Sequence, residues 1–397
     1  MLAVLKSLKK LVNSESIPSA AAAERRLDRS QGMSGQDPGC QPVIAACADW
    51  LCLAQDRSAS ADGGVARDFS LVKGWATSYP ETTGYIIPTM IELARRQNSA
   101  DLHQRARRML DWCVSIQYQD GGFQGGKIDA TPRVPVTFNT GQILLGLAAG
   151  AAEYDDPRYL DSLKRAAGWL RDTQDADGCW RKHPTPFAAQ GEKAYETHVS
   201  WGLFEAERVA PGNGFGEAGL RQVDWAMTKQ QPNGWFASNC LSDPAMPLTH
   251  TIGYVLRGVV EAHRLTRRPD LLAAACRTAD SLCAVIDAEG RLAGRLDSKF
   301  RPAVDWVCLT GSVQIAHCLL MLHLVTGQAH YLDAGRRANR FVRRTVRLDG
   351  VVEQRGGVKG SFPVDGDYGR WEFLNWAAKF CIDANLLEID IDAQQHA

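Results

Sequence analysis

The chain has 397 residues, 45% of them hydrophobic, which is enough to bury a large core in one or more domains. Its 45 Lys and Arg residues balance its 45 Asp and Glu residues, which argues against a strongly basic surface for nucleic acid. We find no run of about 18 apolar residues and expect no membrane-spanning helix. The eleven cysteines form no CxxC pair and no zinc-finger spacing. Because no secretory signal is recognisable, we expect a reducing, cytoplasmic location.

Residues 1–40 differ in composition from the rest of the chain. Residues 1–12 place a leucine at every third position, with three lysines between, and a polar stretch rich in Ser, Gly and Ala follows. We expect residues 1–40 to form an arm with an amphipathic start and a flexible linker. A weak contact of residues 1–12 with a membrane surface is the alternative to a free arm. Residues 41–397 are expected to form a single catalytic domain.

A repeated unit organises this domain. Four tryptophans are each followed five positions later by a glutamine, and a glycine-containing turn comes next. Successive tryptophans lie about 60 residues apart, which is the spacing of a structural repeat. Two degenerate units, with turns at Glu289-Gly290 and Asp349-Gly350, bring the total to six. The four clear pairs are Trp50–Gln55, Trp112–Gln117, Trp169–Gln174 and Trp225–Gln230.

Each unit predicts two helices. The segment before the turn, such as 101–117, has apolar residues at the helical period and should have one exposed face. The segment after the turn, such as 141–153 or 307–325, is apolar on most sides, which is typical of a buried helix. Thr or Ser residues that can cap a helix stand near most of these second starts. Six such pairs predict an all-α fold, an (α/α)6 toroid with inner and outer helix layers.

The turns resemble the QW repeats of squalene-cyclase-like and prenyltransferase-like toroids. The matching strings are Gln117…Gly121…Phe123, Gln174…Gly178…Trp180 and Gln230…Gly234…Phe236. The Asp-x-Asp-Asp acid motif of class II cyclases is absent, and the nearest string is Asp365-Gly366-Asp367-Tyr368. The Asp, Cys and His zinc ligands of protein prenyltransferases have no recognisable counterpart either. The resemblance therefore implies the fold and not that chemistry.

A closer resemblance is to uncharacterised bacterial toroid proteins associated with polysaccharide biosynthesis. Among the strings that carry it are 78–85, 138–142, 247–251, 308–311, 359–363 and 375–379. Many carbohydrate-active toroids, including uronate hydrolases, lyases and sugar epimerases, share this architecture. The resemblance implies a glycan substrate and leaves the reaction open.

Candidate site residues gather where the second helix of each unit begins. In a toroid these helices run parallel, so their N-termini surround one mouth and favour an anionic ligand there. Each candidate also has a structural explanation, as a cap, a helix-start acid or a core aromatic. As catalytic groups we predict Glu81, Tyr85, Glu196, His198, His250, Asp305 and Asp367. As substrate-binding groups we predict Tyr79, Arg133, Asn139, Tyr254, Trp306, Tyr368, Arg370, Trp371 and Glu372.

This set of side chains suits proton abstraction by an epimerase or lyase acting on an acidic, uronate-bearing glycan or glycolipid intermediate. A His or Tyr would act as base, and an Arg, Asn or His would neutralise the uronate carboxylate. Glycoside hydrolysis by paired carboxylates is nearly as well supported. A terpenoid cyclase or prenyltransferase-like enzyme and a non-catalytic glycan-binding toroid remain alternatives. No nucleotide-binding glycine loop or HExxH motif occurs, so we expect no cofactor and no metal.

Overall fold

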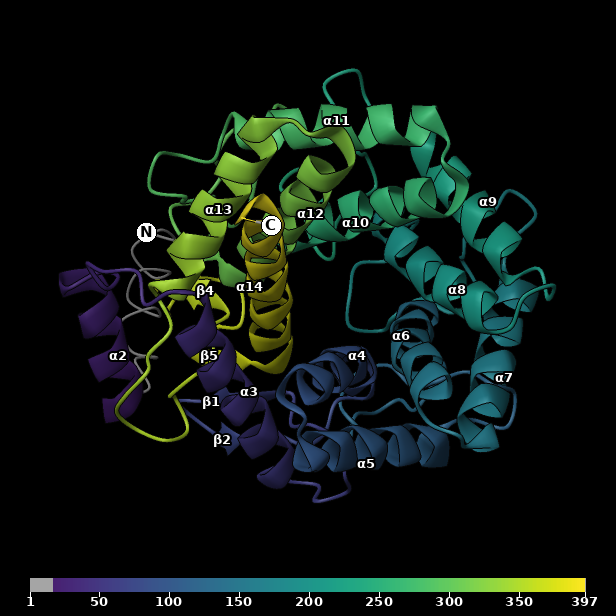
Figure 1. Ribbon diagram of the computed structural model, residues 1–397, viewed down its shortest axis with the longest axis horizontal. Helices are drawn as coiled ribbons and strands as arrows, with labels where there is room; N and C mark the ends of the chain where they lie inside the picture. Colours follow the sequence, from purple (N-terminus) through teal and green to yellow (C-terminus); the bar gives the residue numbers. More distant parts are fainter. Residues whose placement is uncertain (1–16, 397) are drawn as a thin grey trace, which may run out of the picture.

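The computed structural model describes residues 17–396, which form a closed ring of paired helices (Figure 1). Each inner helix packs against the next one, and α14 also packs against α4 and α3, which closes the ring. The predicted (α/α)6 toroid is therefore confirmed. The inner helices are α4 (Pro80–Gln97), α6 (Thr137–Glu153), α8 (Thr197–Val209), α10 (Thr249–Thr266), α12 (Leu309–Thr326) and α14 (Asn375–His396). The outer helices are α3 (Cys40–Asp56), α5 (Ala100–Ile116), α7 (Pro157–Thr173), α9 (Phe215–Met227), α11 (Pro269–Cys283) and α13 (Ala329–Arg343).

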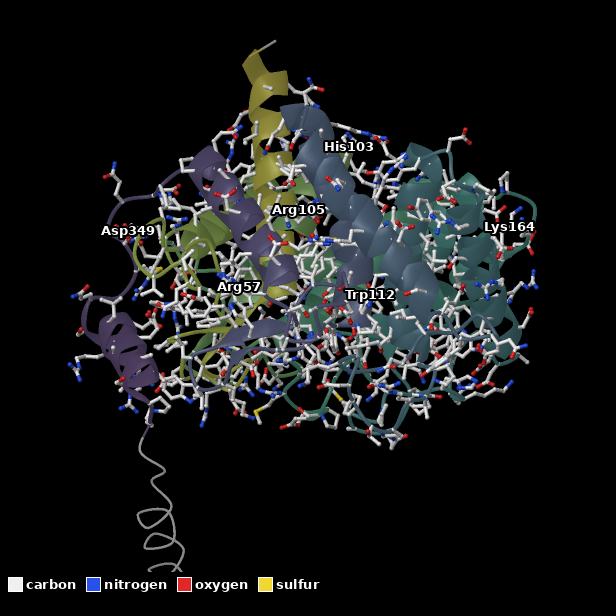
Figure 2. All side chains as sticks on the ribbon, turned by 90° about the horizontal axis from the view of Figure 1, so that it is seen from below. Arg57, His103, Arg105, Trp112, Lys164 and Asp349 are labelled. Carbon is white, nitrogen blue, oxygen red and sulfur yellow. The ribbon has the colours of Figure 1, made fainter. Side chains whose placement is uncertain are left out.

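The loops that lead into the inner helices gather on one face of the ring. Figure 2 shows α5 running from His103 toward Trp112, and so toward this loop face. Two small antiparallel sheets order the loops. In one sheet β1 (Asp68–Ser70) pairs with both β2 (Gly74–Trp75) and β5 (Glu372–Leu374), and in the other β3 (Val307–Cys308) pairs with β4 (Ser361–Phe362). The β1–β5 pairing joins the first unit to the last at the loop face.

The repeated Gln and Gly residues fasten each unit to the next outer helix. The amide Nε2 of Gln174 donates to the Gly178 carbonyl at 2.9 Å and to the Ala218 carbonyl of α9 at 2.8 Å. Gly178 has a positive φ of 93°, and a Cβ at this position would collide with the Arg221 carbonyl of α9. Only glycine meets both demands at the turn. The other three glutamines, Gln55, Gln117 and Gln230, likewise donate to carbonyls of the next outer helix.

The sixth turn lies elsewhere than predicted. A Cβ on Gly350 would meet nothing within 4 Å, so this glycine has no packing role in the ring. A Cβ on Gly356 would collide with the Ala46 carbonyl of α3, which is the contact that the other turn glycines make. Gly356 therefore fills the sixth position, and the prediction of Asp349-Gly350 was wrong because an extra loop segment separates α13 from the turn.

The N-terminal arm also differs from the expectation. Residues 19–30, predicted to belong to a flexible linker, form helix α2 (Ser19–Ser30), which packs on the last unit. The Lys359 ammonium, 3% exposed, contacts the carboxylates of Glu24 (2.9 Å) and Asp28, and Arg347 pairs with Glu24 as well. A buried lysine needs such partners, so this ion cluster fixes α2. Residues 1–12 lie outside the described residues, and their membrane contact stays a prediction.

Helix α12 reaches the length and apolar composition of a membrane span, although we expected no such segment. Of its residues Leu309–Thr326, 72% are buried within the ring. One apolar helix of this kind is weak evidence for a membrane span, because the core helix of a globular domain has the same composition.

Glycines set the spacing of the inner helices. A Cβ on Gly84 of α4 would lie 2.5 Å from the Ile143 Cα of α6. A Cβ on Gly202 of α8 would collide with the Gly141 carbonyl of α6. Removing the Cβ lets neighbouring helices touch backbone to backbone. The six inner helices can therefore close into a narrow ring.

We predict opposite effects for two Gly→Ala substitutions in this ring. Gly202→Ala should lower the free energy of unfolding by about 1–3 kcal/mol, because the new methyl group forces α6 and α8 apart. Gly168→Ala in α7 should raise it by roughly 0.5–1 kcal/mol, because its Cβ would meet nothing within 4 Å and alanine favours the helix. Urea unfolding monitored by circular dichroism measures both. Equal effects of the two substitutions would contradict close packing of the inner ring.

Candidate active site

A cavity of about 230 Å³ opens at the loop face, among the first turns of the inner helices. Its walls come from α4, α6, α10 and α14 and from the loop between α7 and α8. Seven of the sixteen predicted site residues line it, namely Tyr79, Glu81, Tyr85, Asn139, His250, Tyr254 and Tyr368. The expected meeting of distant segments at one mouth is thus observed for these seven residues, whose roles stay predictions.

Helical periodicity explains why acid, base and aromatic groups stack in this cavity. Glu81 occupies the first turn of α4, and Tyr85 follows one turn later on the same face. His250 and Tyr254 have the same relation on α10. The parallel inner helices bring both pairs to the same depth of the ring.

Glu81 is a buried carboxyl, 8% exposed, in the wall of the cavity. Burial raises its pKa to about 8, although a hydrogen bond from Tyr79 and the charge of Arg67 act in the opposite direction. The Asn139 Nδ2 donates to Glu81 Oε2 at 3.0 Å and holds the carboxyl group in the cavity wall. At neutral pH Glu81 is therefore protonated and can act as an acid.

His250 presents the complementary group. Burial, helped by the charge of Arg295, lowers the pKa of His250 to about 3, so the imidazole is neutral at physiological pH. Its Nδ1 has no hydrogen-bond partner among the described residues. The ring packs against Tyr254 at 5.2 Å and Tyr368 at 4.8 Å between centroids, which fixes its position. The neutral imidazole has a free lone pair, but a pKa of about 3 makes it a weak base, and an anionic ligand bound beside it would raise that pKa and favour proton acceptance.

Sequence reasoning missed a cation and an aromatic surface in the wall. The Arg67 guanidinium lies 5.2 Å from the centroid of the Trp376 ring and pairs with Asp68 (2.5 Å) and Glu372 (2.9 Å). The Trp376 Nε1 donates to the Tyr368 hydroxyl at 2.9 Å. Arg67 can contact a substrate carboxylate, and a tryptophan face can support a sugar ring. Phe138 and Tyr195 were also missed, as were Thr82, Thr185, Phe187, Ala188 and Leu241.

Two predicted catalytic residues lie near the cavity without lining it. Glu196 lines a second, adjoining pocket, where burial raises its pKa to about 8. His198 is buried against Tyr254, at 4.4 Å between ring centroids, and its Nδ1 lies 2.6 Å from Gln142 Oε1. The imidazole of His198 is therefore held by a partner within the ring.

The remaining predicted residues do not reach the cavity, so the expectation that they share it was wrong. Asp305 and Arg133 are exposed, and Arg370 and Asp367 form a weak surface ion pair at 3.7 Å. The other three have structural positions. Trp306 is buried beside Leu248 and Cys308, and Trp371 is half-buried in the loop before β5. Glu372 forms an ion pair with Arg67.

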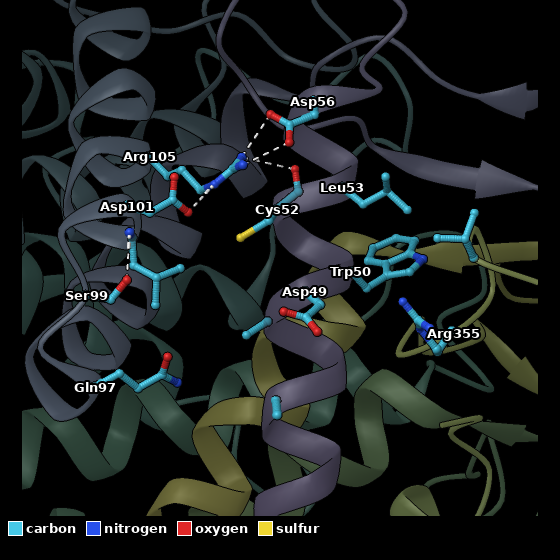
Figure 3. Close-up of a pocket in the computed structure, with 14 residues that line it drawn as sticks. Asp49, Trp50, Cys52, Leu53, Asp56, Gln97, Ser99, Asp101, Arg105 and Arg355 are labelled. Carbon is cyan, nitrogen blue, oxygen red and sulfur yellow. Dashed lines mark hydrogen bonds and ion pairs between the residues drawn. The ribbon is translucent and has the colours of Figure 1, made fainter. Parts of the chain in front are cut away.

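A larger hollow of about 500 Å³ lies on the outer side of the ring, between α3 and α5 (Figure 3). There Arg105 is held by Asp56 and Asp101, each at 2.9 Å. Burial raises the pKa of the Cys52 thiol to about 11, so this cysteine is a poor nucleophile. The paired charges and the unreactive thiol indicate that this hollow is part of the structural framework. No cluster of His, Cys, Asp and Glu suited to a metal occurs among residues 17–396.

Comparison with known proteins supports the fold. No protein-family model matches the chain, and no curated protein sequence matches it either. An unsaturated glucuronyl hydrolase specific for heparin superposes with a TM-score of 0.71 at 14% identity, over 90% of this chain and 99% of that one. The cellobiose 2-epimerase of Bacillus thermoamylovorans gives 0.69 at 12%, over 87% and 97%. A sugar epimerase from a ruminal bacterium gives 0.71 at 11%, over 87% and 97%. At such identities the likeness shows a shared (α/α)6 toroid.

The two buried carboxyls predict a pH-dependent stability. Their pKa values rise from an ordinary 4.5 to about 8 on folding, so the stability they contribute is complete below about 4.5 and is lost as pH rises toward 8. Relative to wild type, Glu81→Gln and Glu196→Gln should each gain unfolding free energy across this window, by up to about 1.4 kcal/mol per pH unit. Urea unfolding from pH 5 to 9 measures the difference. Glu217→Gln, at an exposed position of α9, should show no such gain.

Proposed function

We propose that the chain is a carbohydrate-active enzyme that moves a proton at a ring carbon of an acidic, uronate-bearing glycan or glycolipid intermediate. The observation that carries the proposal is that Glu81 and His250 line one cavity, where burial raises the pKa of the carboxyl and lowers that of the imidazole. An epimerase or a lyase needs such a pair, because one group removes a proton and the other supplies one. Superposable proteins named as sugar epimerases and glucuronyl hydrolases support a sugar as the substrate class.

In the proposed step His250 accepts the proton from the carbon beside the uronate carboxylate. Negative charge then spreads onto that carboxylate, where the Arg67 guanidinium and the unpartnered Tyr85 hydroxyl can stabilise it. Glu81 returns a proton to the opposite face of the carbon in an epimerase, or to the leaving oxygen in a lyase. Trp376 offers an aromatic surface for the ring.

Two other reactions are less well supported. A hydrolase with two carboxylates in one cavity needs a partner for Glu81, but among the described residues that line the cavity Glu81 is the one carboxyl group. A terpenoid cyclase would suit a protonated acid among aromatic rings. However, Arg67 and the unpartnered polar atoms of Tyr85 and His250 favour a polar ligand over a hydrocarbon. The cytoplasmic location remains part of the proposal.

Turnover on uronate-bearing oligosaccharides tests the assignment. We expect Glu81→Gln and His250→Gln each to lower kcat by about 100-fold or more, because each removes one proton-transfer group. Glu92→Gln makes the same change at the far, exposed end of α4 and should leave kcat unchanged. Unimpaired turnover in both cavity variants would reject the proposed pair.

Isotope exchange separates the three sugar reactions. In deuterated water an epimerase should place deuterium on the reacting carbon, which NMR detects. A lyase should instead give an unsaturated sugar that absorbs ultraviolet light, and a hydrolase should give new reducing ends without carbon-bound deuterium. Hydrolysis without exchange would contradict the proposed proton abstraction while keeping the substrate class.

A further inference from the structure

A second pocket, of about 160 Å³, adjoins the main cavity and has no role in the reaction proposed above. Phe138, Thr185 and Tyr195 line both spaces and form the wall between them. Both Glu81 and Glu196 lie close enough to Tyr195 to raise its pKa, although burial is the larger cause. The two carboxyls therefore flank one aromatic wall, and a ligand longer than one sugar ring could occupy both sides.

The pocket contains two buried, chemically complementary side chains, Lys193 and Glu196. They bracket the 3₁₀ helix η1 (Ala194–Glu196), in which three residues complete a turn, so side chains three positions apart point the same way. Lys193 is 6% exposed and Glu196 is 5% exposed. The local backbone thus aligns an ammonium and a carboxyl group along one wall.

Lys193 lacks a counter-ion close by, and Glu196 has an oxygen without a hydrogen-bond partner among the described residues. Lys193 Nζ donates to the Cys240 carbonyl at 3.1 Å, and no carboxylate oxygen of the described residues lies within 4 Å of it. Glu196 Oε2 is buried without a hydrogen-bond partner among the described residues. A buried ammonium group bonded only to a neutral carbonyl has no opposite charge beside it, which costs free energy unless an anion approaches.

The other charges at this pocket are already balanced. Arg181 contacts Asp177 at 2.7 Å and Glu192 at 2.6 Å, and Lys229 pairs with Glu192 at 3.1 Å. The charge of Lys193 is therefore the one that a ligand can compensate. Helix α8 begins at Thr197, directly after Glu196, and its N-terminus adds further positive potential.

We propose that this pocket is a binding site for an anionic group of the substrate, held by the Lys193 ammonium and by a hydrogen bond from the Glu196 carboxyl. The site lies across the aromatic wall from Glu81, so it would receive the carboxylate or other acidic substituent of the sugar next to the reacting one. It would thereby select glycans with charge on adjacent residues. The assignment rests on the proposed function for the nature of the ligand, but not for the existence of the anion site.

The test measures binding of small probes to wild type and to variants, without turnover. The probes are sodium acetate, sodium D-glucuronate and D-glucose at equal ionic strength, followed by NMR titration of the tryptophan indole signals. We expect acetate and glucuronate to bind, and Lys193→Met to weaken both by about 10- to 100-fold, as expected for loss of a charged hydrogen bond. Glucose should bind equally to both proteins.

Matched variants distinguish anion binding at this pocket from a general effect of positive charge on the protein surface. Lys182→Met removes the same charge from an exposed position of the same loop and should leave affinity unchanged. Lys193→Arg, which keeps the charge, should retain most of the affinity if Lys193→Met proves too unstable to measure. Absence of anion binding in wild type, or equal losses in the Lys182 and Lys193 variants, would overturn the site. Anion binding without preference for glucuronate over acetate would keep the site but weaken the proposed sugar substrate.

Discussion

Backbone contact between the inner helices is the constraint on which the rest of this molecule depends. Gly84 and Gly202 sit where a methyl group would strike the next helix, so neighbouring inner helices meet without side chains between them. Interiors packed this closely have few arrangements of equal energy. The ring therefore holds the first turns of its inner helices at fixed separations. The side chains of those turns are consequently held at fixed positions relative to one another.

The same packing determines the pKa values of Glu81 and His250 in the cavity. Because the first turns are buried against one another, Glu81 and His250 lose water, and their pKa values move in opposite directions, to about 8 and about 3. At neutral pH the carboxyl holds a proton, the reverse of its usual state in water, while the imidazole carries none rather than a partial positive charge. Burial thereby places a protonated carboxyl and a neutral imidazole in the wall of one cavity.

The sequence was sufficient to predict the ring and about half of the site. The errors arose mainly where a residue's position depends on loops and long-range pairing and not on the start of an inner helix. The site residues that converge, such as Glu81 and His250, are the second residues of their inner helices. At these positions the toroid fold itself places the side chains at the mouth of the ring. The last inner helix begins at Asn375, after the predicted Asp367, and Trp376 in its first turn was missed. Arg67 depends on pairing between β1 and β5, some 300 positions apart, which no local pattern reveals.

Buried polar atoms without a partner among the described residues occur at the loop-face rim and also in the outer layer, for example at Gln222, Arg337 and Asn339. On the outside Arg105 is fully engaged by Asp56 and Asp101. At the rim Tyr85, His250 and Glu196 each keep a buried polar atom without a partner among the described residues. Each such atom costs about 1–3 kcal/mol of stability. The apolar inner helices and their glycine contacts offset this cost. At the rim Tyr85 and His250 line the cavity and Glu196 lines the adjoining pocket, so their unused hydrogen-bonding capacity lies where a polar ligand could reach it.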